Sequence, residues 1–314
     1  MNTSQYEMIN IEDLVPQNHT YRKLKSLINF KWMVNAAKIE QSQVGAIGYT
    51  AERLVMCLIL QFMEDASDRE FERFMAENVA GKWFCNFAIA EKTPDFTTFC
   101  KFRNAIGQRK IQKLFNELKR QLKKKGCMAE VFTFVDASAL IRRLSMWQER
   151  DAAIKSGYEK FNNEVIEKFS ADPEVRIGAK GNDKFWFGYK KHISVDMNSR
   201  MINKVSVTKA NVPDSDGVSK VLPSQGAVVA DKGYVPAIDL IRKKGLHPMV
   251  ILKNNMKEKN SDKDKFISKL RAPFEGVFSK QNKRVRYAGV EKNQAAELLY
   301  AMAFNMRRLL AITP

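Results

Sequence analysis

Two acidic residues follow short apolar runs that are typical of buried strands. Residues 131–135 read VFTFV and precede Asp136, and residues 227–230 read AVVA and precede Asp231. A carboxylate is costly to bury unless something pairs with it. If the two strands are neighbours, both carboxylates project from one sheet edge at the ~4.8 Å strand spacing and repel each other. A divalent cation, above all Mg²⁺, relieves that repulsion because it prefers hard oxygen ligands.

A third carboxylate is expected beside such a pair, usually from a helix that packs against the sheet. Glu275 is the candidate, 44 residues after Asp231 in the basic segment RAPFEGVFSKQNKRVRYAG. Two metal ions ~3.5 to 4 Å apart can stabilise the attacking and leaving oxygens of a phosphodiester. A simpler interpretation stays open, in which Glu275 pairs with Arg271 on the surface and the two aspartates are turn or capping residues.

The region that carries these acids alternates strands with helices. After the strand at 131–135, the pattern predicts a hairpin of 185–195 and 201–210, a strand at 227–230, a helix at 236–244, a strand at 247–255 and a helix at 291–310. This order predicts an α/β fold with a ribonuclease H-like mixed sheet flanked by helices. Architecture alone does not establish chemistry.

The first 125 residues are predicted to be helical. Thr50–Met63 is apolar and lacks Gly and Pro, Ser67 opens the capping box S-D-R-E, Asp95 is a candidate N-cap, and a second apolar stripe follows Gly107. We therefore expect an all-α N-terminal DNA-binding domain at 1–127. A ribonuclease H-like catalytic domain is expected at 128–314, with an insert at about 137–184.

The charge balance predicts a polyanionic partner. The chain has 53 Lys and Arg against 35 Asp and Glu, a net charge of +18. Nucleic acid is the usual partner of such a chain, and an anionic membrane the second choice. The most apolar stretch, 54–63, is too short to span a bilayer, and the N-terminus lacks the pattern of a signal peptide. We therefore expect a cytoplasmic protein without a membrane partner.

One segment concentrates the positive charge. Residues 101–125 contain ten Lys or Arg and a single acid, Glu117. A solvated helix face is the common explanation of such a run. Nearly uniform positive charge instead favours phosphate binding, because the side chains repel one another without it. The predicted DNA contacts in this segment are Lys101, Arg103, Lys119, Arg120 and Lys123.

Further candidates for DNA contact lie near the acids. Lys190 and His192 share a strand face with Trp186, so they either point at phosphate or lie on a solvent-exposed edge. Arg271, one helical turn before Glu275, either positions that acid or binds DNA. Lys280, Lys283 and Arg284 follow in the same basic segment. Turn and cap duties are assigned to Asp196, Asp214 and Asp216, and no role to the scattered cysteines Cys57, Cys85, Cys100 and Cys127.

Several motifs together suggest a family. VDAS holds Asp136, VVADKGY holds Asp231 and RAPFEGVFSK holds Glu275, after the helical segments TAERLVMCLILQFM, SDREFERFMAENVAGKWFC and TPDFTTFCKFR. In these motifs, over nearly its whole length, the chain resembles the DDE transposases of bacterial insertion sequences. The similar group is the one named after insertion sequence five, within the superfamily named after insertion sequence four. One departure is Asn282, where the superfamily often has a lysine.

The resemblance implies a function. Asp136, Asp231 and Glu275 would be the catalytic residues and the ligands of two Mg²⁺ ions, which Mn²⁺ can replace. The reaction would be strand cleavage by water and strand transfer by the freed 3′-hydroxyl. The partners would be double-stranded DNA, as element ends with terminal inverted repeats and as target, bound by a homodimer in the bacterial nucleoid. Two alternatives stay open: a nuclease on the same core without joining activity, and a non-catalytic DNA-binding regulator.

Overall fold

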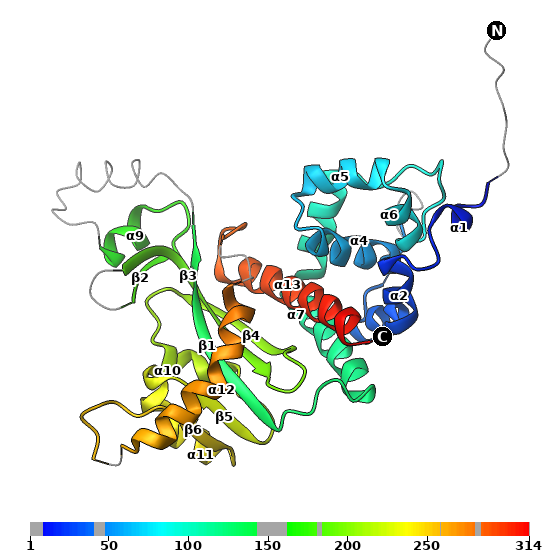
Figure 1. Ribbon diagram of the computed structural model, residues 1–314. Coiled ribbons are helices and arrows are strands. Elements are labelled where there is room, and N and C mark those ends of the chain that lie inside the picture. The colour runs from blue at the N-terminus through cyan, green and yellow to red at the C-terminus, as the bar shows by residue number, and fades with distance from the viewer. Residues whose placement is uncertain are drawn as a thin grey trace, which may run out of the picture. The chain divides into compact units, whose positions relative to one another are not determined.

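The computed structural model describes residues 9–40, 48–142, 162–180, 184–257, 259–279 and 284–313 (Figure 1). The chain forms two compact units, Met1–Gln121 with Met302–Pro314, and Leu122–Ala301. The helices α7 (Phe96–Lys124) and α13 (Val290–Ile312) contribute residues to both units. The C-terminal end of the chain therefore groups with the helical unit, whereas the expected second domain ran to residue 314.

The first unit is helical, as predicted. Besides the greater part of α7 it contains α1 (Ile11–Leu14), α2 (Thr20–Leu27), α3 (Phe30–Ala37), α4 (Ala51–Met63), α5 (Asp68–Glu77) and α6 (Val79–Phe84). All of α4 is buried except Glu52 and Arg53. The unbroken apolar character of this segment is thus explained, since α4 is the central helix of the unit's core.

The predicted helix starts of this unit are confirmed. Ser67 and Glu70 form the reciprocal capping box of α5. Asp95 accepts a hydrogen bond from the backbone N–H of Thr98 at 2.7 Å and so caps α7. Within α7, Gly107 has φ +61° and interrupts the helical geometry. Glycine adopts this left-handed conformation without a Cβ penalty, so the helix kinks at this residue.

The second unit contains a mixed sheet. Its described strands are β1 (Phe132–Ile141), β2 (Arg176–Lys180), β3 (Lys184–Asp196), β4 (Ile202–Lys209), β5 (Ala227–Ala230) and β6 (His247–Val250). They run in the order β2-β3-β1-β5-β6, with β4 also paired to β3. β1, β5 and β6 are parallel, whereas β3 is antiparallel to its partners. The expected mixed sheet is present, and the predicted hairpin is β3 and β4.

Helices cover both faces of this sheet. The described ones are α9 (Asn163–Phe169), α10 (Asp214–Gly217), the 3₁₀ turns η1 (Val218–Lys220) and η2 (Lys232–Ala237), α11 (Ile238–Lys243), α12 (Ser261–Ser279) and part of α13. Val135 and Val228 pack into an apolar cluster with residues of η1, η2 and α11. On the other face, the Phe134 ring lies 6.0 Å from the ring of Phe274 on α12. The acids at the strand ends therefore lie between two helical layers.

Some predicted boundaries differ from the structure. β1 does not end at Asp136 but continues to Ile141, because β3 pairs with it along this length. β6 ends at Val250, earlier than predicted. Pro213 precedes α10, so Asp214 and Asp216 lie in its first turn and do not cap it.

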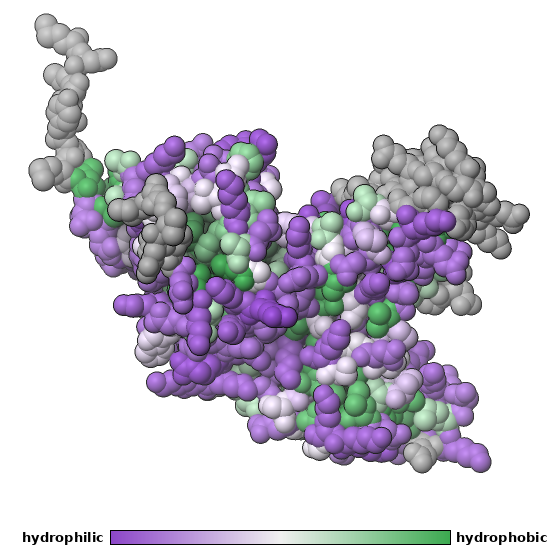
Figure 2. Space-filling model, turned by 180° about the vertical axis from the view of Figure 1, so that it is seen from behind, coloured by the Kyte–Doolittle hydropathy of each residue, from purple (hydrophilic) through white to green (hydrophobic). Residues whose placement is uncertain are grey.

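Part of the expected insert at 137–184 belongs to the sheet. β2 pairs with β3, and α9 precedes it. Residues 143–161 and 181–183 lie outside the described residues. Hydrophilic residues cover most of the face shown in Figure 2, as expected for a chain with 28% charged residues.

Candidate active site

Asp136 and Asp231 lie at the same edge of the sheet. In the parallel pairing of β1 with β5, Phe132 is opposite Ala227 and Phe134 is opposite Val229. The observed pairs end at Phe134 and Val229, so Asp136 and Asp231 each follow two residues after the last pair. Both residues are half-buried. Asp231 directly follows β5, as expected, whereas Asp136 lies within β1, so the meeting of the two acids stays a prediction.

Short local hydrogen bonds hold both carboxylates. Asp231 Oδ1 accepts from the backbone N–H of Gly233 at 2.8 Å, and Asp136 Oδ1 accepts from that of Ala137 at 2.8 Å. An ionised carboxylate has about four acceptor positions. The single hydrogen bond that Asp231 receives here therefore leaves it capacity for another ligand.

Gly233 separates Asp231 from a further acid. A Cβ at this position would lie 3.0 Å from Asp231 Oδ1 and 4.0 Å from Asp214 Oδ2. A side chain would therefore enter the space between two carboxylates. Asp214 is neutralised by Lys190, whose ammonium lies 2.8 Å from its Oδ1. The sequence analysis assigned Asp214 to helix capping and missed this arrangement, because the pairing with β3 is non-local.

Tyr234 brings a buried hydroxyl to the same place. The residue is fully buried, and its hydroxyl has no hydrogen-bond partner among the described residues. Burial raises the pKa of Tyr234, and the negative charges of Asp136, Asp214 and Asp231 raise it further. The hydroxyl therefore stays protonated and is a hydrogen-bond donor close to the acids. Only its position in the DKGY motif hinted at this role.

Helix α12 supplies a cation to this edge. It lies over β1, β5 and β6 (Figure 1), and the guanidinium carbon of Arg271 is 5.5 Å from the centre of the Phe134 ring. Its positive charge lowers the pKa of Tyr234, so Arg271 is within electrostatic range of the acids. The buried Nε of Arg271 has no hydrogen-bond partner among the described residues.

Glu275 lies on α12 one helical turn after Arg271. The preceding residue, Phe274, packs against Phe134, which is two residues before Asp136. This part of α12 therefore runs beside the part of β1 that precedes Asp136. The side chain of Glu275 lies outside what the structure describes.

The described part of this edge fits a hard metal ion in its donor chemistry. Carboxylates such as those of Asp136 and Asp231 are the oxygen ligands that Mg²⁺ prefers. Within the described ranges, His, Cys, Asp and Glu side chains form no group of three or more that could hold a metal ion. The described side chains alone therefore do not make a set of three ligands.

The side chains of Lys190 and His192 are buried, whereas both interpretations of the sequence expected them to be accessible. Lys190 is 8% exposed and pairs with Asp214, and His192 is fully buried with its Nε2 2.9 Å from Thr208 Oγ1. His192 is opposite Ala137 in the sheet register, so it points to the face opposite Asp136. Burial lowers the pKa of His192 to about 4. Neither side chain is presented to a DNA phosphate.

Arg103 also differs from the expectation of an outward DNA contact. It is 7% exposed and donates to both carboxylate oxygens of Asp68, at 2.9 and 2.7 Å. This bidentate pair joins α7 to the start of α5. The guanidinium therefore stabilises the core of the helical unit.

The other four predicted DNA contacts of the 101–125 segment differ in their ion pairs and exposure. Arg120 pairs with Glu117 at 2.7 Å and Lys123 with Glu130 at 2.5 Å. Lys101 is exposed and Lys119 half-buried. The count of positive residues therefore overstates the charge that is available to DNA. The side chain of Arg284 is exposed, and its backbone forms an isolated β-bridge with Ile141 at the end of β1. Lys280, Asn282 and Lys283 lie outside the described residues.

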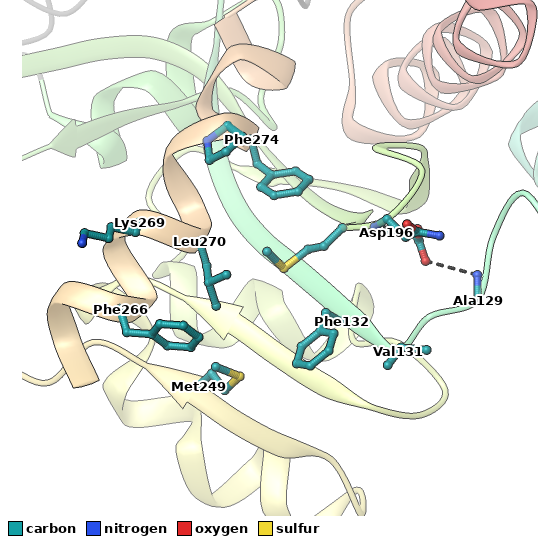
Figure 3. Close-up of a pocket in the computed structure, with 12 residues that line it drawn as sticks. Ala129, Val131, Phe132, Asp196, Met249, Phe266, Lys269, Leu270 and Phe274 are labelled. Carbon is teal, nitrogen blue, oxygen red and sulfur yellow. Dashed lines mark hydrogen bonds between the residues drawn. The ribbon is translucent and has the colours of Figure 1, made fainter. Parts of the chain in front are cut away.

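An apolar pocket of about 750 Å³ lies near the start of β1. Phe266, Leu270 and Phe274 of α12 face Phe132 and Met249 across it, as Figure 3 shows. Asp196 also borders the pocket, but its oxygens accept backbone N–H groups of the β3–β4 turn and of residues 129 and 130. This pocket therefore lacks an open carboxylate for phosphodiester chemistry.

Comparison with protein families gives two matches. Residues 9–105 match a family described as a transposase domain, and residues 164–306 match the family described as the transposase DDE domain. Residues 164–306 therefore form a transposase DDE domain. The second match contains Asp231 and Glu275, whereas Asp136 precedes it. A ribonuclease H-like fold is implied for this domain, and enzymes of the family act with divalent metal ions.

A search of solved structures matches a synaptic complex of the piggyBac transposase with hairpin DNA. The two chains are 12% identical, with a TM-score of 0.30, over 77% of this chain and 52% of that one. This chain thus spans about half the length of the solved chain that it matches. None of its described helices combines the length and apolar character needed to cross a bilayer.

Proposed function

We propose that this transposase binds the terminal inverted repeats of an insertion sequence of the insertion sequence five group, and cuts and joins DNA with Asp136, Asp231 and Glu275. One observation carries the proposal. Asp136 and Asp231 each follow two residues after the last pair of the parallel strands β1 and β5, and α12, which carries Glu275, contacts both strands, which supports a shared site. Catalytic acids need such convergence, because residues far apart in the sequence must share metal ions.

The three carboxylates would hold two Mg²⁺ ions, or Mn²⁺ in their place. When bound, these ions supply Lewis-acid stabilisation of the charge on the phosphate. In cleavage, a water oxygen bonds to phosphorus and the P–O3′ bond breaks; the water loses a proton and the 3′ oxygen gains one. In strand transfer, that 3′-hydroxyl attacks a target phosphorus, loses its proton and displaces the target's own 3′ oxygen.

Two buried donors would serve the substrate. The Tyr234 hydroxyl and Arg271 Nε have no hydrogen-bond partner among the described residues. Buried donors normally have partners. Oxygens of a phosphate, or of water beside it, would provide them when DNA is bound. Arg271 also lies where it can position Glu275.

Lys and Arg side chains would hold the DNA backbone. Lys101, Lys119 and Arg284 keep this role, as do Lys280 and Lys283, and Arg120 and Lys123 can contribute from their ion pairs. Arg103, Lys190 and His192 are not proposed as contacts because they are buried and bound to other side chains. A homodimer on DNA is proposed because two element ends are cut in one assembly.

The test is incubation of labelled element ends with Mg²⁺ and a target plasmid. Inverted repeats that bracket the coding region define the ends. A transposase yields cleaved ends and joined product, the nuclease alternative yields cleavage alone, and a non-catalytic regulator yields binding alone. Asp231→Asn should abolish cleavage while end binding survives. Full cleavage by this variant would refute the assignment.

A further inference from the structure

A second group of cations lies in the helical unit, outside the 101–125 segment. Arg22, Lys23 and Lys25 of α2 line a pocket of about 750 Å³ that also includes Trp83 of α6. All three cations are half-buried. Partly desolvated like charges on one helix are unfavourable unless a negative charge compensates them.

The described residues compensate these charges only in part. Arg22 pairs with the carboxylate of Glu12 and donates to the Val15 carbonyl oxygen at 3.1 and 2.9 Å. The Lys23 ammonium donates to the neutral carbonyl oxygen of Thr313 at 2.6 Å. Within the described ranges, Glu12 is the carboxylate that forms an ion pair with this group.

Lys25 shows the electrostatic consequence. Its ammonium donates to two neutral oxygens, at 2.5 and 3.2 Å. Burial lowers the pKa of Lys25 and the charge of Arg22 lowers it further, although Glu12 and Glu52 act in the opposite direction. The pocket therefore carries a positive charge that an anion would stabilise.

We propose that this pocket binds a phosphodiester group of the DNA backbone, an inference that rests on the proposed function. The exposed side chains of Gln17, Asn18 and Ser26 line the same pocket and add neutral amide and hydroxyl donors. Phosphate oxygens accept from this combination of charged and neutral donors. The pocket thus adds a DNA contact in a segment to which the sequence analysis assigned none.

The aromatic wall indicates a contact to phosphate and not to a base. The Arg22 guanidinium carbon and the Lys25 ammonium lie 4.6 and 4.5 Å from the Trp83 ring centre. These cations occupy the ring surface on which a base would stack. The contact should therefore position the DNA without reading its sequence.

The test uses the full-length double variant Lys23→Gln/Lys25→Gln, in which amides keep hydrogen-bond donors but lose both charges. We expect its affinity for labelled element-end DNA to fall about 10- to 30-fold near 0.15 M salt. The slope of log K against log salt should decrease by about 2. Lys31→Gln/Lys92→Gln is the matched control, because it removes two exposed lysines of the same unit outside the pocket.

A phosphate scan locates the contact and separates it from a loss of folding. Single methylphosphonate substitutions, which remove one backbone charge, should weaken wild-type binding at a particular position. The double variant should be insensitive there and unchanged in its response elsewhere. If the double variant is unfolded, it would instead lose binding to every DNA and would show no cooperative thermal transition. Lys23→Arg would then replace it in the scan. This variant keeps the positive charge and should keep the sensitivity to methylphosphonate substitution at that position.

Two results would overturn the inference. One is an equal loss of affinity in the control pair, and the other is unaltered sensitivity of the double variant at every phosphate. If wild-type protein neither binds nor cuts element ends, the proposed function fails as well. If wild-type protein does both and the pocket variant binds equally tightly, only the pocket assignment fails.

Discussion

Two groups of residues in the sheet unit contain the same three residue types. They differ in how many of their polar side-chain atoms have a hydrogen-bond partner. Asp172, Tyr189 and Arg142 form one group. Asp172 is 2% exposed, and it accepts hydrogen bonds from the Arg142 guanidinium, the Tyr189 hydroxyl and the Gly289 backbone N–H. The Tyr189 hydroxyl in turn accepts from Gly289 at 2.9 Å. In this closed group each residue has a partner, as in a structural network.

Asp231, Tyr234 and Arg271 form the other group. Here the Tyr234 hydroxyl and Arg271 Nε have no partner among the described residues, and Asp231 receives a single short bond from Gly233. The residue types are therefore not what separates a structural cluster from a functional one. Unfilled hydrogen-bonding capacity separates them, because a site must keep donors and acceptors for its substrate. The closed group should control stability and the open group should control activity.

The largest effect is expected at the open edge. Asp136→Asn keeps the shape of the side chain but removes its charge, so strand cleavage should fall by at least about a thousandfold, which corresponds to ~4 kcal/mol of transition-state stabilisation. Cleavage of labelled ends, with thermal unfolding as the control for folding, measures this. A variant that unfolds at a much lower temperature would place Asp136 in the structural class instead.

The closed group should show the converse behaviour. Asp172→Asn leaves the guanidinium of Arg142 buried without a counter-charge, so the free energy of unfolding should fall by about 3 kcal/mol. Urea unfolding measures the change. Cleavage per folded molecule, at a temperature where the variant is still folded, should stay close to the wild-type rate. A selective loss of cleavage at unchanged stability would contradict the distinction.

Glu130 extends the comparison to pH. Glu130 is 2% exposed, and burial alone would raise its pKa. The ion pair with Lys123 and the hydrogen bonds from Ser224 outweigh burial and lower the pKa of Glu130 to about 2. The stability it contributes is present above the unfolded-state pKa of about 4.3 and is lost as pH falls toward 2, roughly 3 kcal/mol in all. Glu130→Gln should flatten this part of the stability curve. An identical pH dependence in both proteins would show that Glu130 contributes nothing to it.

Local signals predicted the elements well. The capping box at Ser67, the N-cap at Asp95 and the strand before Asp231 were confirmed, because each depends on residues only a few positions apart. The position of Asp231 directly after β5 was also predictable, because the apolar run before it indicates a buried strand. The extension of β1 to Ile141 was not, because it depends on pairing with β3, which is distant in the sequence.

The fate of individual charges was the least predictable feature. Arg103 and Lys190 looked like exposed DNA contacts, but each is buried against an aspartate distant in the sequence, Asp68 and Asp214. A sequence gives the sign of a charge but not its partner, which tertiary packing selects. The missing partner of the Tyr234 hydroxyl was invisible for the same reason.

The smallest effects come from removing one hydroxyl in each group. Tyr189→Phe breaks bonds to a buried carboxylate and to Gly289, so stability should fall by about 1.5 kcal/mol while cleavage is retained. Tyr234→Phe removes a hydroxyl without a described partner, so stability should stay the same or rise slightly. Its cleavage should fall about tenfold, because a donor to substrate oxygens is lost. Urea unfolding and single-turnover cleavage of the two variants side by side distinguish the classes. If Tyr234→Phe is as unstable as Tyr189→Phe and cuts normally, its hydroxyl has an internal partner, and the open group loses one of its two unfilled donors.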